Sequence, residues 1–279
     1  MKERIKKILR VLKIYHPLQS FYRGTIYKIK NYYYRNRYAK FKGEGFTCNV
    51  CKSSYKNFIP DYPKPENRVA IEKNKVIAGY GENIICPNCM STARERLVLA
   101  FLDTYSLQNK KVLHLSPEKH VYNYLKRNTF ITAADLHPDF YKPIGTGILK
   151  ADATSLQFEN DYFDIVIANH IMEHIDDDQT ALSEIFRVLK PGGRAVLQVP
   201  YSQINFATIE TPGINNPVLQ SKLYGQKDHV RIYSLLDYVS RLKLSGFVVV
   251  TKNYSQLDHL YKYAIQKNES FLEITKPIA

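Results

Sequence analysis

Residues 163–193 read FDIVIANHIMEHIDDDQTALSEIFRVLKPGG, a short apolar run followed by a longer segment with helical periodicity. The opening run is apolar apart from Asp164, which is typical of a central parallel strand buried on both faces. Apolar residues then recur at helical spacing from Leu182 to Leu189, and Pro191-Gly-Gly ends the helix. The stretch therefore predicts one strand–helix unit of an α/β protein.

The same alternation of strands and helices extends to both sides of this unit. Thr92 and Glu95 fit a capping box ahead of a helical apolar stripe. Further apolar runs predict strands at residues 111–115, 130–134, 147–151 and 195–199, and a helix at 233–244 with runs at 247–250 and 260–266 could complete the sheet. Strands and helices that alternate in this way require parallel strands with right-handed crossovers. We therefore predict a doubly wound, open α/β sheet.

Polar residues directly follow four of the predicted strands: Ser116, Asp135, Asp152 and Asn169. Doubly wound sheets bind ligands at the carboxyl ends of their strands, so these residues would share one rim. Asp135 can accept hydrogen bonds from both ribose hydroxyls of a nucleoside, and Asp152 can accept one from an exocyclic amine such as that of adenine. The alternative is that both carboxylates only cap the turns that follow them. Their position after successive strands favours a nucleoside site.

Over residues 91–266 the chain resembles the class I S-adenosylmethionine-dependent methyltransferases. The motifs that carry the resemblance are VLHLSPE (112–118), ITAAD (131–135), KADATSLQF (150–158), FDIVIANHIMEHI (163–175) and ALSEIFRVLKPGG (181–193). The last two are the most specific. The resemblance implies a seven-stranded, mostly parallel Rossmann-like sheet whose last strand is antiparallel, and methyl transfer from the sulfonium of the cofactor.

The resemblance also implies roles for the rim residues. Asp135 would hold the ribose of S-adenosylmethionine, and Asp152 with Ala153 would hold the adenine. Asn169 and His170 would line the sulfonium and methionine end. His174, next to that rim, is interpreted as structural.

One loop departs from the family pattern. The first strand of the family usually runs into a glycine-rich loop, whereas Ser116-Pro117-Glu118 is followed by Lys119 and His120 without any glycine. We expect this loop to present its amides in ordinary αR or β geometry, with Glu118 facing the ammonium group of the cofactor. The missing glycines also argue against a nicotinamide dehydrogenase, which needs G-x-G-x-x-G at a helix N-terminus.

Cys48-x-x-Cys51 and Cys86-x-x-Cys89 contain all four cysteines of the chain. Two such turns can supply a tetrahedral shell of thiolates for Zn²⁺. A redox motif and four unrelated buried thiols are the alternatives, but redox motifs usually occur singly beside a βαβ unit. We predict a zinc-ribbon-like module over residues 46–90. Its zinc would be structural, because four Cys ligands leave no open position for water.

Most of the net charge of +14 lies in residues 1–45, a basic and aromatic arm whose only acidic residues are Glu3 and Glu44. The nearly neutral remainder argues against a basic face that grips nucleic acid along its whole length. Residues 2–13 form a basic amphipathic pattern that suits an anionic membrane surface. The Tyr- and Arg-rich residues 31–41 could instead stack on bases or glycans. The third possibility is a helix packed on the protein body with a solvated charged face.

The segment YGQKDHVRIY, residues 224–233, is similar to one found in zinc-bearing relatives of the family. It follows the fifth strand, where the resemblance implies an acceptor pocket. His229 could act as general base for a hydroxyl acceptor, Asp228 could orient it, and Arg231 could hold an acidic substrate. The alternative is that His229 and Arg231 only anchor this loop to Glu173 or Asp176.

These observations lead to three functional hypotheses for a methyltransferase domain spanning residues 91–279. The first is an S-adenosylmethionine-dependent methyltransferase for a small molecule or glycan precursor, O-directed by preference. The second is an RNA methyltransferase that uses the zinc module and basic arm, and the third is a non-catalytic zinc protein on a degenerate scaffold. No apolar run approaches the ~18–20 residues of a membrane span, and the N-terminal sequence is a poor secretory signal. We expect a cytoplasmic protein, with the arm allowing contact with the inner face of the membrane.

Overall fold

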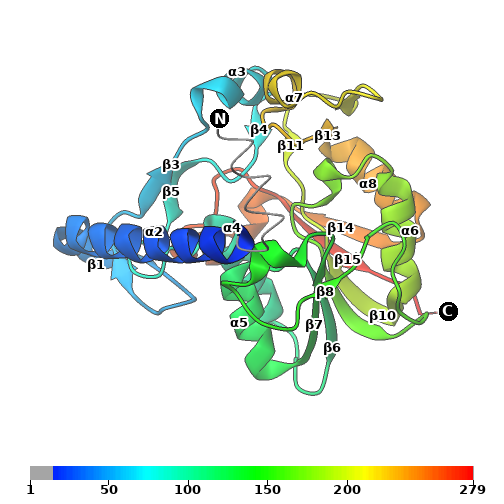
Figure 1. Cartoon of the computed structure of the whole chain (residues 1–279), viewed down its shortest axis with the longest axis horizontal. Helices are drawn as coiled ribbons and strands as arrows, with labels where there is room; N and C mark the ends of the chain where they lie inside the picture. The colour runs from blue at the N-terminus through cyan, green and yellow to red at the C-terminus, as the bar shows by residue number, and fades with distance from the viewer. Residues whose placement is uncertain (1–14, 279) are drawn as a thin grey trace.

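The computed structural model describes residues 15–278 (Figure 1). The amphipathic helix predicted over residues 2–13 lies outside this part of the chain, so its contact with a membrane surface stays a prediction. None of the helices in the described residues combines the length and apolarity needed to cross a membrane.

A seven-stranded sheet forms the centre of the molecule (Figure 1). Its strands follow the order β14–β15–β10–β9–β6–β7–β8, and within it only β15 runs antiparallel to its neighbours. The strands are β6 (Lys111–Leu115), β7 (Phe130–Asp135), β8 (Leu149–Lys150), β9 (Phe163–Ile167), β10 (Leu189–Val196), β14 (Val248–Lys252) and β15 (Phe271–Thr275). This arrangement confirms the predicted doubly wound, mostly parallel sheet.

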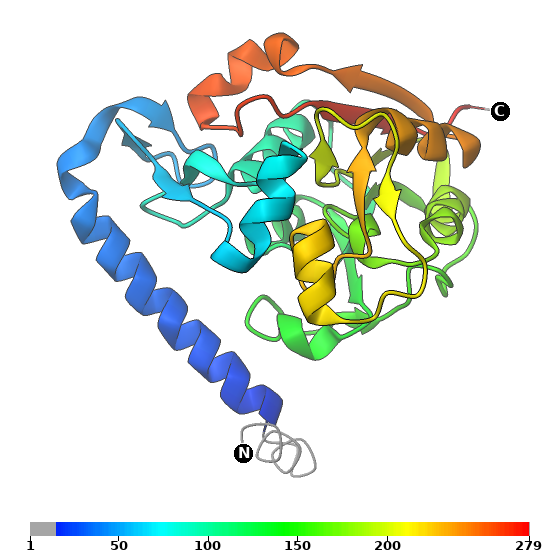
Figure 2. The ribbon, with the colours of Figure 1, turned by 90° about the horizontal axis from the view of Figure 1, so that it is seen from above.

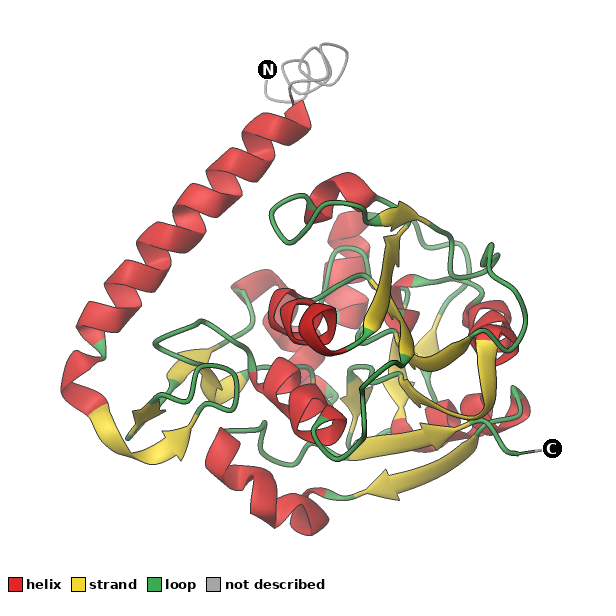
Figure 3. Ribbon diagram, turned by 90° about the horizontal axis from the view of Figure 1, so that it is seen from below, coloured by secondary structure: helices red, strands yellow, loops and turns green. Residues whose placement is uncertain are grey.

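Helices cover both faces of the sheet (Figure 3). Ile165 and Ile167 of β9 pack with one pair of helices, whereas Val166 packs with the other pair. The two pairs are α4 (Ala93–Leu102) with α5 (Lys119–Asn128), and α6 (Asp178–Val188) with α8 (Leu235–Leu244). β9 is therefore buried on both faces, as its apolar sequence predicts. The capping box of Thr92 and Glu95 is present at the start of α4.

One predicted strand is wrong. The run 260–266 belongs largely to a 3₁₀ segment, η4 (Tyr254–Tyr263), and β15 comes later at Phe271–Thr275. Leu257 and Leu260 are buried three positions apart, the period of a 3₁₀ helix. A short apolar run with several aromatic residues fits both structures, and packing on α4 decides between them.

A second, smaller sheet joins two distant parts of the chain. Its order is β12 (Ile209–Glu210), β13 (Arg231–Ser234), β11 (Tyr201–Ser202) and β4 (Val76–Ile77). β4 belongs to the long segment between the two Cys pairs, and α3 (Pro65–Lys73) in that segment packs against α7 (Pro217–Tyr224) (Figures 1 and 2). Gly225 permits this contact, because a Cβ there would lie 2.7 Å from Cγ1 of Ile71. The segment is thus fastened to the body of the protein.

The four cysteines lie in a small module beside the main sheet. Two antiparallel pairs build it, β1 (Lys42–Thr47) with β2 (Ser54–Tyr55), and β3 (Ile59–Asp61) with β5 (Gly81–Ile85). The long helix α2 (Tyr15–Arg37) runs along this module and joins it through η1 (Ala39–Phe41) (Figure 2). Tyr27 donates a hydrogen bond to the carbonyl of Cys89, and Asn31 and Arg35 donate to that of Asn88. The C-terminal half of α2 is therefore packed on the protein, while Tyr32 and Tyr33 remain exposed.

Candidate functional site

The four cysteines converge on one point, as their spacing predicts. Cys48 Sγ lies 3.6 Å from Cys89 Sγ, and Cys51 Sγ lies 3.7 Å from Cys86 Sγ. A tetrahedral zinc with bonds of about 2.3 Å would hold neighbouring sulfurs about 3.8 Å apart. All four cysteines are free of disulfides. The sulfur positions therefore fit a tetrathiolate zinc site.

The two cysteine turns have the same backbone geometry. Lys52 N donates to the carbonyl of Cys48, and Met90 N donates to that of Cys86. Lys52 and Met90 both have positive φ values, 60° and 61°. Each turn thus curls its two thiols toward the same centre, and a residue other than glycine accepts the left-handed conformation in both cases.

Arg96 adds a second observation that fits a metal. Its side chain is fully buried in α4, and burial by itself lowers its pKa, while the sulfurs of Cys48, Cys86 and Cys89 oppose that effect. The guanidinium donates to backbone carbonyls of Tyr263, Ser91, Ile84 and Ala264. A zinc ion with four thiolates carries net negative charge, which would balance this buried cation. Arg96 also ties the module to the main domain.

The predicted rim residues meet at a cavity of about 360 Å³, which we name the strand-end cavity. It lies at the carboxyl ends of β6, β7 and β8. Of the predicted cofactor residues, those that line it are Ser116, Asp135, Asp152, Ala153 and His170. Both carboxylates also cap turns, because Asp135 accepts from His137 N and Asp152 accepts from Thr154 N. The capping and ligand-binding interpretations are therefore compatible.

Asp152 and Asp135 differ in their surroundings. Asp152 is exposed, and hydrogen bonds from the backbone and side chain of Thr154 lower its pKa. Asp135 accepts one bond on each oxygen, from His137 N and from the hydroxyl of Ser116. A carboxylate has about four lone-pair sites, so Asp135 keeps capacity for two more donors.

The glycine-free loop corrects one expectation. Ser116 has a φ of 47°, in the left-handed region, instead of the ordinary αR or β geometry expected. Its amide donates to the carbonyl of Ala134 and its hydroxyl donates to Asp135, so two bonds hold the strained residue. The loop therefore turns through a left-handed residue other than glycine, and this serine adds a contact to the rim.

Three of the predicted cofactor residues do not line the strand-end cavity: Pro117, Glu118 and Asn169. The side chain of Glu118 is 9% exposed, pairs with Arg94 at 2.8 Å and accepts a hydrogen bond from Asn169 at 2.9 Å. A guanidinium thus already faces the carboxylate that we expected to face the cofactor's ammonium group. No local pattern identifies Arg94, in the first turn of α4, as the partner of Glu118, because the two residues meet only in the folded chain.

A second cavity of about 310 Å³ adjoins the first, since His170 and His174 line both. One wall comes from the segment between the Cys pairs, through residues such as Asp61, Val76 and Tyr80. The opposite wall includes His229 and Arg231 from the segment after the fifth strand. The module therefore contributes surface to a cavity beside the rim, which its cysteine spacing alone could not indicate.

Glu173, His174 and His229 lie at this second cavity, and we name them the Glu173 cluster. Ligand atoms of the three residues all lie within 4.8 Å of one another. Burial by itself raises the pKa of Glu173, but the imidazoles that face it, His170 first among them, lower it to about 2. Burial lowers the pKa of His229 to about 4, although Glu173 opposes this. The cluster thus combines an ionised carboxylate with a neutral imidazole.

The predicted catalytic residues are not arranged as expected. The carboxylate of Asp228 is exposed, lies 3.8 Å from Nδ1 of His174 and accepts a bond from Gln226. In the described part of the chain no hydrogen bond joins it to His229, so the predicted orientation of His229 by Asp228 is not what the structure shows.

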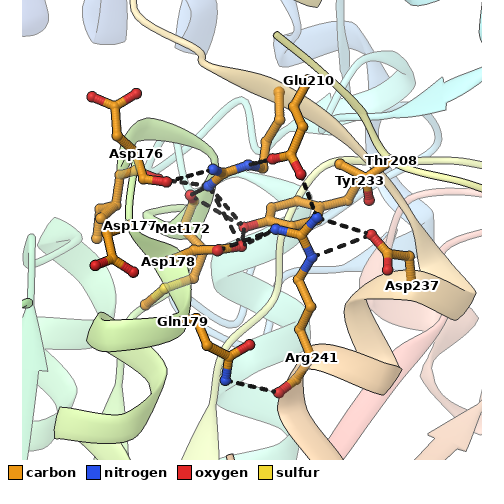
Figure 4. A network of polar contacts seen from close by, with 12 residues as sticks. Met172, Asp176, Asp177, Asp178, Gln179, Thr208, Glu210, Tyr233, Asp237 and Arg241 are labelled. Atoms are coloured by element: carbon orange, nitrogen blue, oxygen red, sulfur yellow. Dashed lines mark hydrogen bonds and ion pairs between the residues drawn. The ribbon is translucent and has the colours of Figure 1, made fainter. Parts of the chain in front are cut away.

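Arg231 is buried and donates to other groups of the protein. Figure 4 shows the network around its partners Asp178 and Glu210, with Arg241 on the same two carboxylates. Arg231 pairs with Glu210 at 2.7 Å and with Asp178 at 3.4 Å. It also donates to backbone carbonyls of Met172, Ile175 and Asp176. These contacts agree with the anchoring alternative, because each nitrogen of the guanidinium already donates to a group of the protein.

Comparison with known proteins places part of the chain in a family. Residues 109–197, from β6 to the end of β10, match the model of the family described as "Methyltransferase domain". "Demethylmenaquinone methyltransferase" of Streptomyces avermitilis is 50% identical over 50 residues, 18% of this chain and 22% of that protein. "Ubiquinone/menaquinone biosynthesis C-methyltransferase UbiE" of Vibrio vulnificus is 43% identical over 49 residues, 18% of this chain and 19% of that protein. The chain thus aligns with about a fifth of the length of these relatives.

Among solved structures, an S-adenosylmethionine-dependent methyltransferase from Mesorhizobium loti is 14% identical, with a TM-score of 0.48. The alignment covers 66% of this chain and 97% of that one. The family match and the strand order of the central sheet agree with each other. Residues 109–197 therefore match a methyltransferase domain, and they lie within a sheet that has the strand order expected from the class I S-adenosylmethionine-dependent methyltransferases.

Proposed function

We propose that this protein transfers a methyl group from S-adenosylmethionine to a small molecule bound in the second cavity. The observation that carries the proposal is the contact between the two cavities, which share His170 and His174. One cavity presents carboxylates at the ends of parallel strands, where doubly wound folds bind nucleosides. The other offers enclosed space next to it for an acceptor.

The residues around the strand-end cavity fit the cofactor. Asp135 has free acceptor capacity for the ribose hydroxyls, and Asp152 stands one strand further along for the adenine amine. Phe140 and Tyr141 on η2 (Pro138–Tyr141) add aromatic surface to the same cavity. When bound, S-adenosylmethionine supplies an electrophilic methyl group. The protein's task is then to place the acceptor in line with that methyl, and positioning of this kind can lower a barrier by several kcal/mol.

The second cavity favours a small acceptor over a polymer. Its volume of about 310 Å³ is at the lower end of small-ligand pockets. Its walls combine apolar residues with polar groups such as Tyr80, Arg94 and His229, a composition suited to a polyol or sugar precursor. A hydroxyl acceptor is our preference for this reason. We retain His229 as the member of the predicted catalytic set that faces the acceptor.

Calorimetry with S-adenosylhomocysteine tests the cofactor half of the proposal. The native chain should bind it, and Asp135→Ala should weaken binding at least about tenfold, the effect of losing charge-assisted hydrogen bonds. Lys252→Ala, on β14 at the far edge of the sheet, is the matched control and should bind normally. No detectable binding by the folded native chain would exclude methyl transfer and favour a non-catalytic scaffold.

Labelled cofactor tests the acceptor half. Incubation of the protein with cell extract should place the labelled methyl in low-molecular-mass fractions. Label that appears instead in RNA, through binding that weakens steeply with salt, would contradict a small acceptor and support the RNA alternative.

A further inference from the structure

The Glu173 cluster contains buried atoms that lack partners. Glu173 is about 1% exposed, and its Oε2 has no hydrogen-bond partner. Its Oε1 lies 3.6 Å from Nδ1 of His170 and 3.9 Å from Nε2 of His174, both longer than ordinary hydrogen bonds. Nε2 of His170 is also buried without a partner. A buried carboxylate with an unpaired oxygen is costly unless a cation compensates it.

The hydrogen bond of His174 indicates that the cation is a metal ion. Its Nδ1 lies 3.1 Å from the backbone carbonyl oxygen of Asp228. Because a carbonyl oxygen can only accept, Nδ1 carries a proton, so Nε2, which faces Glu173, is the nitrogen left for a metal ion. Metal-binding histidines show this arrangement, with one ring nitrogen donating to a backbone carbonyl and the other directed at the ion.

Neighbouring contacts hold the three residues in place. Val230 N donates to the carbonyl of Glu173 and so fixes the segment of His229 beside η3 (Met172–His174). The carbonyl bonds of Arg231 fasten the same two segments together. The cluster is therefore pre-organised and does not depend on flexible side chains alone.

We propose that Glu173, His174 and His229 bind a divalent first-row transition-metal ion at the second cavity, separate from the four-cysteine site. Two imidazoles and one carboxylate are a donor set that suits iron, cobalt, nickel or zinc better than magnesium or calcium. Three protein ligands leave coordination positions open toward the cavity. There the ion could bind an acceptor oxygen and lower the pKa of a hydroxyl.

The inference goes beyond the proposed methyl transfer and does not depend on it. A metal bound here assigns His229 a ligand role, so the ion and not the imidazole would activate a hydroxyl. The proposal is tested by metal binding alone, without cofactor or acceptor. Failure to bind metal would leave the S-adenosylhomocysteine result unaffected, and the reverse is also true.

The test is a Co²⁺ titration of the full chain whose cysteine site has first been filled with one equivalent of zinc, so that the Glu173 cluster stays open. The native protein should bind one further Co²⁺ per chain, seen by ligand-field absorption without thiolate-to-cobalt charge transfer. Glu173→Gln and His174→Asn should each weaken this binding at least about tenfold. His259→Asn, an exposed histidine on η4, is the matched control and should bind as the native chain does.

His174 is about a third exposed, so His174→Asn keeps the test valid if the buried Glu173→Gln fails to fold. Circular dichroism of each variant establishes that it is folded. Absence of the cobalt absorption in the native chain would overturn the proposal. Equal affinity in native protein and His174→Asn would overturn it as well.

Discussion

The four-cysteine centre and the strand-end cavity both form where short loops converge, but different interactions hold them. The cysteine centre sits in a module of two-stranded pairs with a small apolar cluster around Cys48, Tyr55 and Phe58. The strand-end cavity sits on a seven-stranded sheet with buried side chains on both faces. A module with so little core would depend on a zinc ion held by its four cysteines, whereas the shape of the cavity is set by the sheet. Removal of the metal should therefore unfold the cysteine module and leave the strand-end cavity intact.

Removal of zinc should produce the largest effect and show this difference most clearly. Cys86→Ser, or treatment with a strong chelator, should unfold residues 46–90, because structural zinc contributes on the order of 10 kcal/mol in small modules. Hydrogen exchange should rise throughout the module and in β4. The strands β6, β7 and β9 should stay protected, and S-adenosylhomocysteine should still bind within a few-fold of the native affinity.

Equal loss of protection in the module and the main sheet would contradict this separation. Cys86→Ser in protein already freed of metal should cause no further change, which provides the control. Because the segment between the Cys pairs lines the second cavity, methyl transfer should fall even though the cofactor still binds.

Arg231→Gln should produce the next largest effect, on stability of the main domain. Removal of one partner from a buried ion pair costs about 3–5 kcal/mol, because Asp178 is then compensated only by Arg241. Denaturant unfolding measures the loss. Arg187→Gln, which removes a more exposed pair with Glu184, should cost about 1 kcal/mol or less. Similar costs for the two variants would mean that Arg231 is not the anchor described.

Ser116→Ala should have a moderate effect on the strand-end cavity. The variant loses the hydroxyl that donates to Asp135 but keeps the strained left-handed conformation. We expect affinity for S-adenosylhomocysteine to fall about three- to tenfold, the value of one hydrogen bond. Ser116→Gly relieves the backbone strain and is the informative companion. It should recover stability but not the lost affinity.

Glu269→Gln should have an effect that depends on pH and is absent below about pH 4.5. Burial raises the pKa of Glu269 to about 8 from its usual 4.5, despite the opposing charge of Arg94. As pH rises above 4.5, the unfolded chain releases this proton first, so the native protein loses stability up to about pH 8. The amide does not titrate, so the variant should be more stable than the native chain at pH 8 by about 1–3 kcal/mol. Below pH 4.5 the advantage should vanish. Thermal unfolding of both chains across this range measures it.

Much of the fold could be predicted from sequence because its signals are local. The apolar run of β9, the capping box at Thr92 and the Cys-x-x-Cys spacing each lie within a few residues of one another. The run 260–266 failed because an aromatic-rich apolar segment fits either a strand or a 3₁₀ turn, and contacts with α4 choose between them.

The candidate sites also divide into features that local sequence predicts and features that depend on tertiary contacts. The strand-end carboxylates follow from strand positions, whereas the pairing of Glu118 with Arg94 joins the loop after β6 to the first turn of α4, whose proximity no local pattern reveals. The occupation of Arg231 by Asp178 and Glu210 is likewise a tertiary contact, formed only when β12, β13 and α6 come together. The Glu173 cluster needed Glu173 and His229 to be brought together from segments far apart in the chain.

A crystal structure of the zinc-loaded chain with S-adenosylhomocysteine is the most direct test of the central claim. Both ribose hydroxyls should lie within hydrogen-bond distance of the Asp135 carboxylate, and the adenine should lie beside Asp152. The sulfur should point toward His170, at the boundary with the second cavity. A ligand bound elsewhere, or one whose ribose avoids Asp135, would contradict the assignment of this rim as the cofactor site.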